Sequence, residues 1–304
     1  MNKRGFEFSF AWLFAVVVGA VIIFLAIYAA TNLIETNRYE TDTRIAAQLE
    51  SVLSPVGTNL EESKYVKIVF PDETRIFNRC SNVGTFGNQL ISTSVRSGLG
   101  KEWMAPGAEI ESKDKYVFSE SIVQTKEANV FVKSFNLPYK VSDLIIIYSG
   151  EYCFVNPPGY VEDEILGLNL PGINITDNLA DCKKDTKRVC FSSFDRNCDL
   201  LVEEEEVEGL YYFDDLIYPA IFSEKEVYEC QLRRLMKRTA ELAELYAKKS
   251  EFLSAQGCSS NLESELAIYS NLLKDYEGSQ NLGFIEQKSK EIEDINERLI
   301  CKLF

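Results

Sequence analysis

The chain has 304 residues, eight cysteines, no histidine and a formal net charge of −15 at pH 7. Without histidine, this chain alone cannot build a serine–histidine–aspartate hydrolase, a cysteine–histidine protease or a histidine-ligated zinc hydrolase. Its acidity argues against nucleic-acid binding, which needs a basic surface that neutralises phosphates. We therefore expect neither an enzyme nor a cofactor-dependent protein, and only carboxylate-pair chemistry, at Glu162 and Glu164 or at Asp214 and Asp215, stays open.

The first predicted element is an apolar run at residues 8–30, which follows a short basic leader at residues 1–7. A helix of 23 residues at ~1.5 Å per residue is about 34 Å long, enough to cross a hydrocarbon core of about 30 Å. A buried helix of a soluble protein is the alternative, but this run is apolar on every face. We predict one membrane-spanning helix in contact with lipid.

The cysteines orient the chain across the membrane. Lys3 and Arg4 before the apolar run are nearly balanced by Arg38 and Arg44 after it, so charge alone does not decide. All eight cysteines follow the run, as expected of a disulfide-bonded domain in an oxidising compartment. The sequon at residues 174–176 (Asn-Ile-Thr) agrees with exposure on the outer face. We expect a single-pass protein of the cell membrane, with its N-terminus in the cytoplasm, the bulk of the chain outside and protein partners at the cell surface.

The leader carries a second signal. The order KRGF at residues 3–6, followed by a long apolar helix, resembles the class III signal of type IV pilins and archaeal pilin-like proteins. The resemblance covers only the first ~30–50 residues. It implies cleavage between Gly5 and Phe6, retention of the apolar helix as an anchor, and packing of that helix in a filament or pseudopilus. The fifth mature position, often glutamate in pilins, is Phe10 here, and the nearby acid is Glu7. A plain uncleaved anchor is the alternative.

Residues 31–54 are predicted to continue the membrane helix as a stalk. Apolar side chains recur there at approximate helical spacing among polar residues, at Ile34, Ile45, Leu49, Val52 and Leu53. Pro55 and Gly57 are predicted to end the stalk, because proline lacks a backbone donor and restricts the residue before it.

Residues 55–222 are predicted to form a β-rich extracytoplasmic domain. Segments rich in β-branched and aromatic residues predict strands at residues 65–70, 73–77, 89–95, 116–119, 129–135, 143–148 and 151–155. A short acidic helix is predicted to end at Leu166, and residues 187–192 and 198–204 are predicted to form a hairpin. Glycines from Gly84 to Gly107 mark a loop-rich zone that lacks the spacing of a phosphate-binding loop.

One acidic stretch matches part of a calcium-loop pattern. Oxygen ligands stand at positions one, three, five, nine and twelve of that pattern, namely Asp195, Asn197, Asp199, Glu203 and Glu206. Position six, where the loop needs a sharp turn, is Leu200 rather than glycine. A solvated acidic hairpin is the alternative.

The cysteines are interpreted as disulfide partners rather than zinc ligands. Zinc sites use close pairs of ligands two to four residues apart, which differs from the spacing of Cys80, Cys153, Cys182, Cys190, Cys198, Cys230, Cys258 and Cys301. We predict a bond between Cys258 and Cys301, because they lie at ends of two helices that meet in an up-down-up unit. The pairing of the other six stays open.

Residues 223–304 are predicted to form a helical hairpin or three-helix unit packed on the β-rich domain. Ser223 and Glu226 match a capping box, Gly257 ends the first long helix, and further helices are predicted near residues 261–276 and 284–303.

The first long helix of this unit also carries a basic cluster. We interpret it as a solvated face with ion pairs to Glu229 and Glu241, and a docking face is the alternative; the cluster comprises Arg233, Arg234, Lys237 and Arg238.

These elements predict an α+β protein in which one transmembrane helix extends into a stalk, a disulfide-bonded β-rich domain follows outside the membrane, and helices end the chain. The function we expect is that of a membrane-anchored structural or interaction protein of the cell surface, such as a pilin-like or pseudopilin-like subunit. The alternative is an anchored extracytoplasmic module that binds a soluble ligand with support from calcium.

Overall fold

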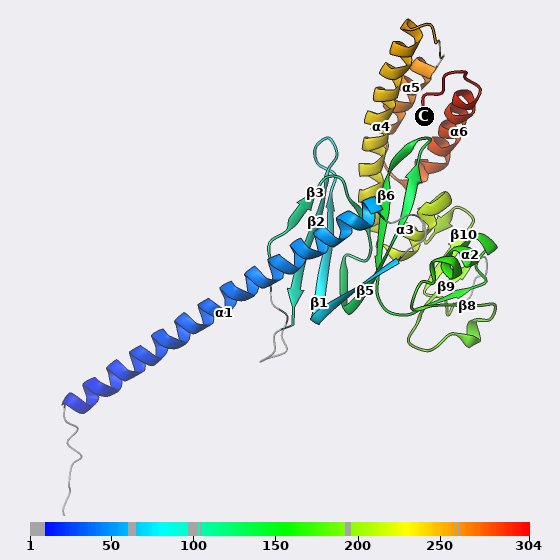
Figure 1. The fold of residues 1–304 in the computed structure, drawn as a ribbon. Helices are drawn as coiled ribbons and strands as arrows, with labels where there is room; N and C mark the ends of the chain where they lie inside the picture. Colours follow the sequence, from blue (N-terminus) through cyan, green and yellow to red (C-terminus); the bar gives the residue numbers. More distant parts are fainter. Residues whose placement is uncertain are drawn as a thin grey trace, which may run out of the picture.

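A computed structural model of the chain describes residues 10–59, 65–96, 103, 105–191, 196–258, 260 and 262–304. It confirms the α+β class, with a long N-terminal helix, two sheets and a C-terminal group of helices (Figure 1). The helices are α1 (Phe10–Asn59), α2 (Gly159–Leu168), α3 (Ile217–Phe222), α4 (Lys225–Ala255), α5 (Leu262–Lys274) and α6 (Leu282–Glu297), with the short 3-10 helices η1 (Leu179–Asp181), η2 (Asp214–Leu216) and η3 (Ser279–Asn281).

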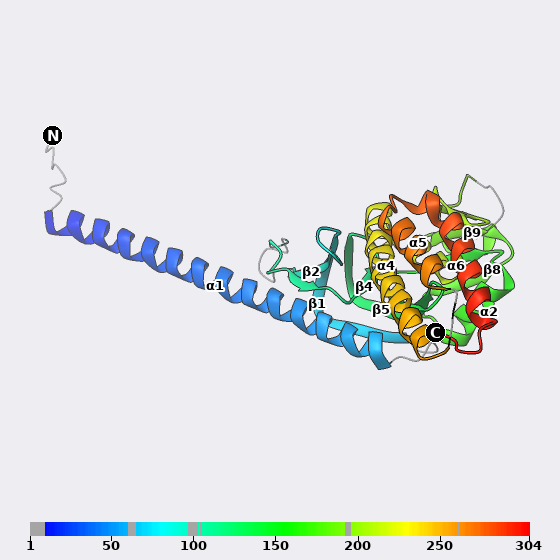
Figure 2. The same ribbon diagram turned by 90° about the horizontal axis from the view of Figure 1, so that it is seen from above.

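Helix α1 is continuous from the apolar run into the stalk and projects from the rest of the molecule (Figure 2). The predicted end at Pro55 and Gly57 is wrong, because the helix runs on to Asn59. A proline removes one helical hydrogen bond. The turns before it are held in place, since Leu49 and Leu53 are buried against the first sheet.

The first sheet has the strand order β3-β2-β1-β5-β6-β4 and is antiparallel except for the parallel pair β4–β6. The two strands predicted at residues 65–70 and 73–77 are one long strand, with a shift in its pairing to β5 between Val69 and Thr74. The strands are β1 (Tyr65–Ser81), β2 (Asn88–Val95), β3 (Ile110–Ser112), β4 (Tyr116–Phe118), β5 (Ile122–Asn136) and β6 (Lys140–Tyr148).

Helices cover both faces of this sheet. Successive side chains of a strand point to opposite faces. In β6, Ile145 and Ile147 belong to the core that contains Leu49 and Leu53 of α1. Leu144, Ile146 and Tyr148 belong instead to the main core, which contains residues of α3 and α4. Burial on both faces explains why residues 144–148 form an unbroken apolar run.

The second sheet has the order β12-β11-β10-β9-β7-β8. The predicted hairpin between residues 187–192 and 198–204 is wrong, because β9 and β10 run parallel, with Val189 opposite Leu200. A hairpin occurs one strand later, where Glu203 pairs with Glu206 in β11. The strands are β7 (Tyr152–Val155), β8 (Ile173–Thr176), β9 (Lys187–Phe191), β10 (Leu200–Glu203), β11 (Glu206–Val207) and β12 (Leu210–Tyr211).

The C-terminal helices share the main core with both sheets. Leu235 and Met236 of α4, Leu266 of α5 and Ile285 of α6 are all buried in it. The predicted capping box is wrong: α4 begins at Lys225 after Glu224, and the buried Ser223 hydroxyl has no hydrogen-bond partner among the described residues. Packing of the apolar stripe, rather than a side-chain cap, therefore sets where this helix begins.

Candidate functional site

The stalk half of α1 is joined to the first sheet by polar contacts as well as apolar ones. Asp42 is buried, its Oδ1 atom accepts a hydrogen bond of 3.2 Å from the Val95 amide, and its carbonyl oxygen accepts one of 2.8 Å from the Thr93 hydroxyl. One helical turn on, Ala46 is fully buried. These hydrogen bonds to the last residues of β2 therefore fix the position and the rotation of α1 on the first sheet.

Two further contacts hold the same face of α1. The amide of Ala108 donates a hydrogen bond of 2.9 Å to the Thr43 hydroxyl. Lys115 is buried and its Nζ atom pairs with the Glu50 carboxylate, while the Glu50 carbonyl oxygen lies 3.0 Å from the same Nζ. Ala108 and Lys115, both between β2 and β4, therefore contact the same side of α1.

The first half of α1 is apolar and exposed. The most apolar 18-residue window of the segment Phe10–Leu33 has a mean hydropathy of 2.9, and none of that window is buried. Large side chains on all sides of it are exposed, including Phe14, Ile22 and Phe24. By length and composition this is a helix that can cross a membrane.

All eight cysteines lie in pairs at disulfide distance. The predicted pair Cys258–Cys301 is present, with Cα atoms 6.2 Å apart, and ties the end of α4 to the segment after α6. The pairs that the sequence left open are Cys80–Cys230, Cys153–Cys182 and Cys190–Cys198. Cys80–Cys230 links β1 to α4 across 150 residues, and the other two staple the second sheet.

The basic cluster on α4 is turned into the molecule, and the predicted solvated face is wrong for Arg234, which is fully buried. Its guanidinium donates to the carbonyl oxygens of Phe86, Lys113 and Lys115 at 3.1, 3.1 and 2.7 Å, and lies 4.6 Å from the ring of Tyr116. Burial lowers the pKa of Arg234 to about 10. The guanidinium therefore joins the β1–β2 connection to the β3–β4 connection of the first sheet.

The neighbours of Arg234 act in the same way. Arg233 donates to the carbonyl oxygen of Glu277 at 2.9 Å, Lys237 to that of Gly84 at 3.0 Å, and Arg238 to that of Val141 at 2.8 Å. The four basic side chains of the cluster thus bind backbone carbonyl groups of the β1–β2 connection, the β3–β4 connection, the connection after α5 and the start of β6. The burial of Arg234 could have been predicted from the sequence, since position 234 follows Val227 and Gln231 at helical spacing on the buried face of α4.

The calcium candidates are partly outside the described residues, since Asp195 is one of the residues not described. Asp199 accepts a hydrogen bond of 2.8 Å from the Arg188 amide, and Asn197 uses its carbonyl oxygen to bind the Arg188 side chain. Glu203 and Glu206 face each other across the β10–β11 pair. Among the residues that the structure describes, no three acidic or cysteine side chains form a group that could hold a metal ion.

A buried lysine unites two of the carboxylates considered from the sequence. Lys133 of β5 lies 3.1 Å from Glu164 Oε1 on α2 and 3.2 Å from Asp215 Oδ1 in η2, with the ring of Tyr218 5.8 Å away. The sequence suggested the neighbours Glu162 with Glu164 and Asp214 with Asp215, whereas the structure brings together one member of each pair. A lysine inside the apolar strand VFVKSF was the signal for this site.

The electrostatics of this cluster follow from its burial. Burial raises the pKa of Asp215 to about 6, against the attraction of Lys133, which lowers it. For Lys133, burial acts to lower the pKa, but Asp215 and Glu164 outweigh it and the pKa is raised. The cluster joins β5 of the first sheet to α2 and η2, and its geometry is that of an internal ion pair network.

An open groove lies between the β5–β6 turn and α6. Two adjoining pockets of about 530 and 410 Å³ share Pro138 and Glu293. The larger is lined by Asp214, Glu286 and Glu293, with Lys290 paired to Glu286. Its surplus of negative charge suits a polar or cationic ligand better than an apolar one.

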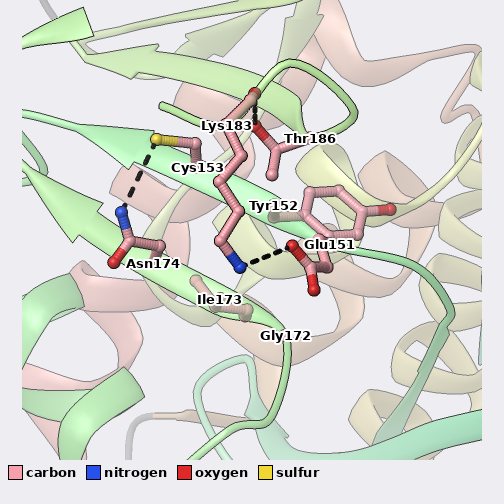
Figure 3. Close-up of a pocket in the computed structure, with 8 residues that line it drawn as sticks. All are labelled: Glu151, Tyr152, Cys153, Gly172, Ile173, Asn174, Lys183 and Thr186. Carbon is pink, nitrogen blue, oxygen red and sulfur yellow. Dashed lines mark hydrogen bonds and ion pairs between the residues drawn. The ribbon is translucent and has the colours of Figure 1, made fainter. Parts of the chain in front are cut away.

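A smaller pocket of about 270 Å³ lies on the second sheet, between β7 and β8 (Figure 3). Lys183 spans its mouth and pairs with Glu151 at 3.1 Å. Asn174 Nδ2 lies 4.0 Å from the Sγ atom of Cys153 on the pocket wall. All of these groups bind or orient polar atoms, and none forms a nucleophile–base pair.

The processing residues Gly5 and Phe6 lie outside the described residues. No family model, no curated protein and no solved structure matches this chain.

Proposed function

We propose that the protein is a single-pass, membrane-anchored structural or interaction subunit of the cell surface. The observation that carries this proposal is the division of α1 into two halves. Its first 24 residues, Phe10–Leu33, are apolar and unburied, while its later turns are packed on the first sheet through Asp42, Leu49 and Leu53. A helix of a soluble core buries its apolar surface within its own chain, so the exposed half needs lipid or another apolar helix around it.

The disulfides support an extracytoplasmic head. Structural disulfides persist in oxidising compartments and are rare in the cytosol. The second sheet depends on them most, since Cys153, Cys182 and Cys190 form the centre of its small second core. We infer that the N-terminus lies in the cytoplasm and that the head, which begins at residue 65, lies outside.

Pilin-like assembly is the specific form of this proposal. Cleavage between Gly5 and Phe6 removes the basic residues and leaves the apolar helix as the new N-terminus. Rigid continuity of α1 from Phe10 to Asn59 supports such a subunit, because a head held at a fixed angle to the anchor can be stacked repeatedly. Phe10 at the fifth mature position would place an apolar side chain among the packed helices, where many pilins have a glutamate.

Intact mass measurement of the full chain, purified from membranes of its own host without reductant, tests the processing step. A chain that begins at Phe6 supports pilin-type processing, and Gly5→Leu is then expected to retain Met1. Gly19→Ala is the matched control, because Gly19 lies in α1 with no neighbouring atom within 4 Å. A chain that begins at Met1 in both variants and in the wild type contradicts pilin-type processing and leaves a plain anchor.

Labelling of whole cells with a membrane-impermeant amine reagent tests the orientation. Lys183 and Lys140 have side chains 75% and 62% exposed, so both are expected to react if the head is outside. A head that reacts only after the cells are opened contradicts the proposed orientation.

A further inference from the structure

Asn174 lies at the surface of the second sheet. It lies on β8, which pairs with β7 alone and forms one edge of the second sheet. Ile173 and Ile175 pack against the main core, so the alternation of a strand places Asn174 and Thr176 together on the opposite face. The Asn174 side chain is exposed.

The three residues Asn174-Ile175-Thr176 form the acceptor sequence for N-linked glycosylation, and the chain contains this pattern once. We propose that Asn174 carries an N-linked glycan. The inference rests on the proposed function in one respect only, which is that the head must lie outside the membrane to meet a glycosyl donor.

The transfer step requires a lipid-linked sugar phosphate as donor and a host transferase. A bond forms between Asn174 Nδ2 and the anomeric carbon of the first sugar, and the bond between that carbon and the donor phosphate oxygen breaks. The lipid phosphate leaves with the bonding electron pair, and the amide nitrogen gives up one proton. No oxidation or reduction takes place, and the Thr176 hydroxyl is left unchanged.

The surroundings of Asn174 suit a bound sugar. Its side chain lies over the pocket of about 270 Å³, whose mouth carries the charged groups of Glu151 and Lys183 (Figure 3). Sugar hydroxyls bind carboxylate and ammonium groups, so the first ring has polar partners on the protein. The rest of the glycan would lie along the outer edge of β8 and cover the unpaired backbone groups that make an edge strand prone to association.

The chain supplies an internal comparison. Asn178 is also exposed and lies four residues further on, but Ala180 stands where a sequon needs a hydroxyl. The Asn178 side chain instead accepts a hydrogen bond of 3.0 Å from the Ala180 amide. Asn178 is therefore expected to remain unmodified in the same molecule.

The test is peptide mass spectrometry of the full chain purified from membranes of its own host. Trypsin releases residues 141–183 as one peptide, which holds Asn174, Asn178 and both members of the Cys153–Cys182 pair. We expect a glycan mass on Asn174 in the wild type. Asn174→Gln and Thr176→Val are expected to lose it completely, whereas Thr176→Ser keeps the hydroxyl and is expected to keep the glycan. Circular dichroism and non-reducing mobility of each variant show whether the head has folded.

Three outcomes overturn the proposal. The first is an unmodified Asn174 in cells whose head reacts with the impermeant amine reagent, and this leaves the proposed function intact. The second is an unmodified Asn174 in a head that is protected in whole cells, which also contradicts the proposed orientation. The third is a glycan mass that survives in both folded Asn174→Gln and Thr176→Val, since the sugar must then be attached elsewhere.

Discussion

Gly107 lies so close to α1 that a methyl group added to it would stand 2.6 Å from the amide nitrogen of Thr43. Two of the three nearest atoms, Thr43 N and Asp42 C, are backbone atoms of a helix, which cannot move aside cheaply. This one contact shows how tightly the loop before β3 holds the stalk.

Gly107→Ala is therefore expected to lower the free energy of unfolding by about 1–3 kcal/mol through overpacking. Denaturant unfolding of the full chain in detergent measures the change. Gly167→Ala is the matched control: Gly167 lies inside α2 with no atom near its added methyl group, and alanine there is expected to raise stability by about 0.5–1 kcal/mol. Equal losses in the two variants would contradict the close approach to α1.

Removal of the Arg234 side chain should be far more damaging than removal of its neighbour. Arg234→Met leaves the buried carbonyl groups of Lys113 and Lys115 without their donor, so we expect a loss of about 3 kcal/mol or more. Arg233→Met removes one hydrogen bond at a half-buried position and is expected to cost under about 1 kcal/mol. Thermal unfolding of the two variants side by side shows which one loses more stability. A larger loss in Arg233→Met would contradict the structural role of the buried Arg234 guanidinium.

The stability of the head should depend on the charge of Asp215. The pKa of Asp215 is about 6 in the folded protein and 3.8 ordinarily, so the folded state holds the proton more tightly. The stabilisation that this provides is complete below about pH 3.8 and is lost as the pH rises through about 6.

Asp215→Asn keeps the neutral form at every pH. Relative to the wild type, the variant is expected to gain about 1–2 kcal/mol between pH 4.5 and pH 7.5, after a discount for the part of the side chain in contact with water. Urea unfolding at the two pH values measures the gain. A difference between variant and wild type that is constant with pH would show that Asp215 does not titrate in this range.

The four disulfides are expected to contribute different amounts to the free energy of unfolding, because they close loops of different length. In the chain-entropy model, Cys80–Cys230, with a separation of 150, is worth about 5 kcal/mol, and Cys190–Cys198, with a separation of 8, about 2.5 kcal/mol. Paired Cys→Ala variants, compared by thermal unfolding without reductant, are expected to follow that order. Equal losses would mean that local packing, rather than loop length, governs the contribution.

Local patterns predicted α4 well. The apolar stripe of α4 and the glycine at position 257 placed that helix within a few residues of its observed bounds, and the ends of two helices brought Cys258 to Cys301. These predictions needed only periodicity and the short reach of helical connections.

Contacts between distant segments were beyond local patterns. Whether β9 and β10 pair parallel or antiparallel depends on the path between them, while their composition fits both. Arg233 and Arg234 are identical in type and adjacent in sequence, yet only Arg234 is fully buried, because the loops that it binds come from residues 86–115. The pairing of Lys133 with Glu164 and Asp215 likewise required three separate elements to meet.

Helix α1 sets the distance between its apolar segment and the head. Leu33 ends the apolar segment of α1, and Asp42, nine residues further along the helix, is buried against the first sheet. Nine helical rises of ~1.5 Å each make that interval about 14 Å along the helix axis. At physiological ionic strength the Debye length is about 8 Å. In an anchored molecule with α1 along the membrane normal, the head would therefore stand more than one Debye length from the membrane surface, and salt would weaken the repulsion between a protein of charge −15 and anionic lipid headgroups.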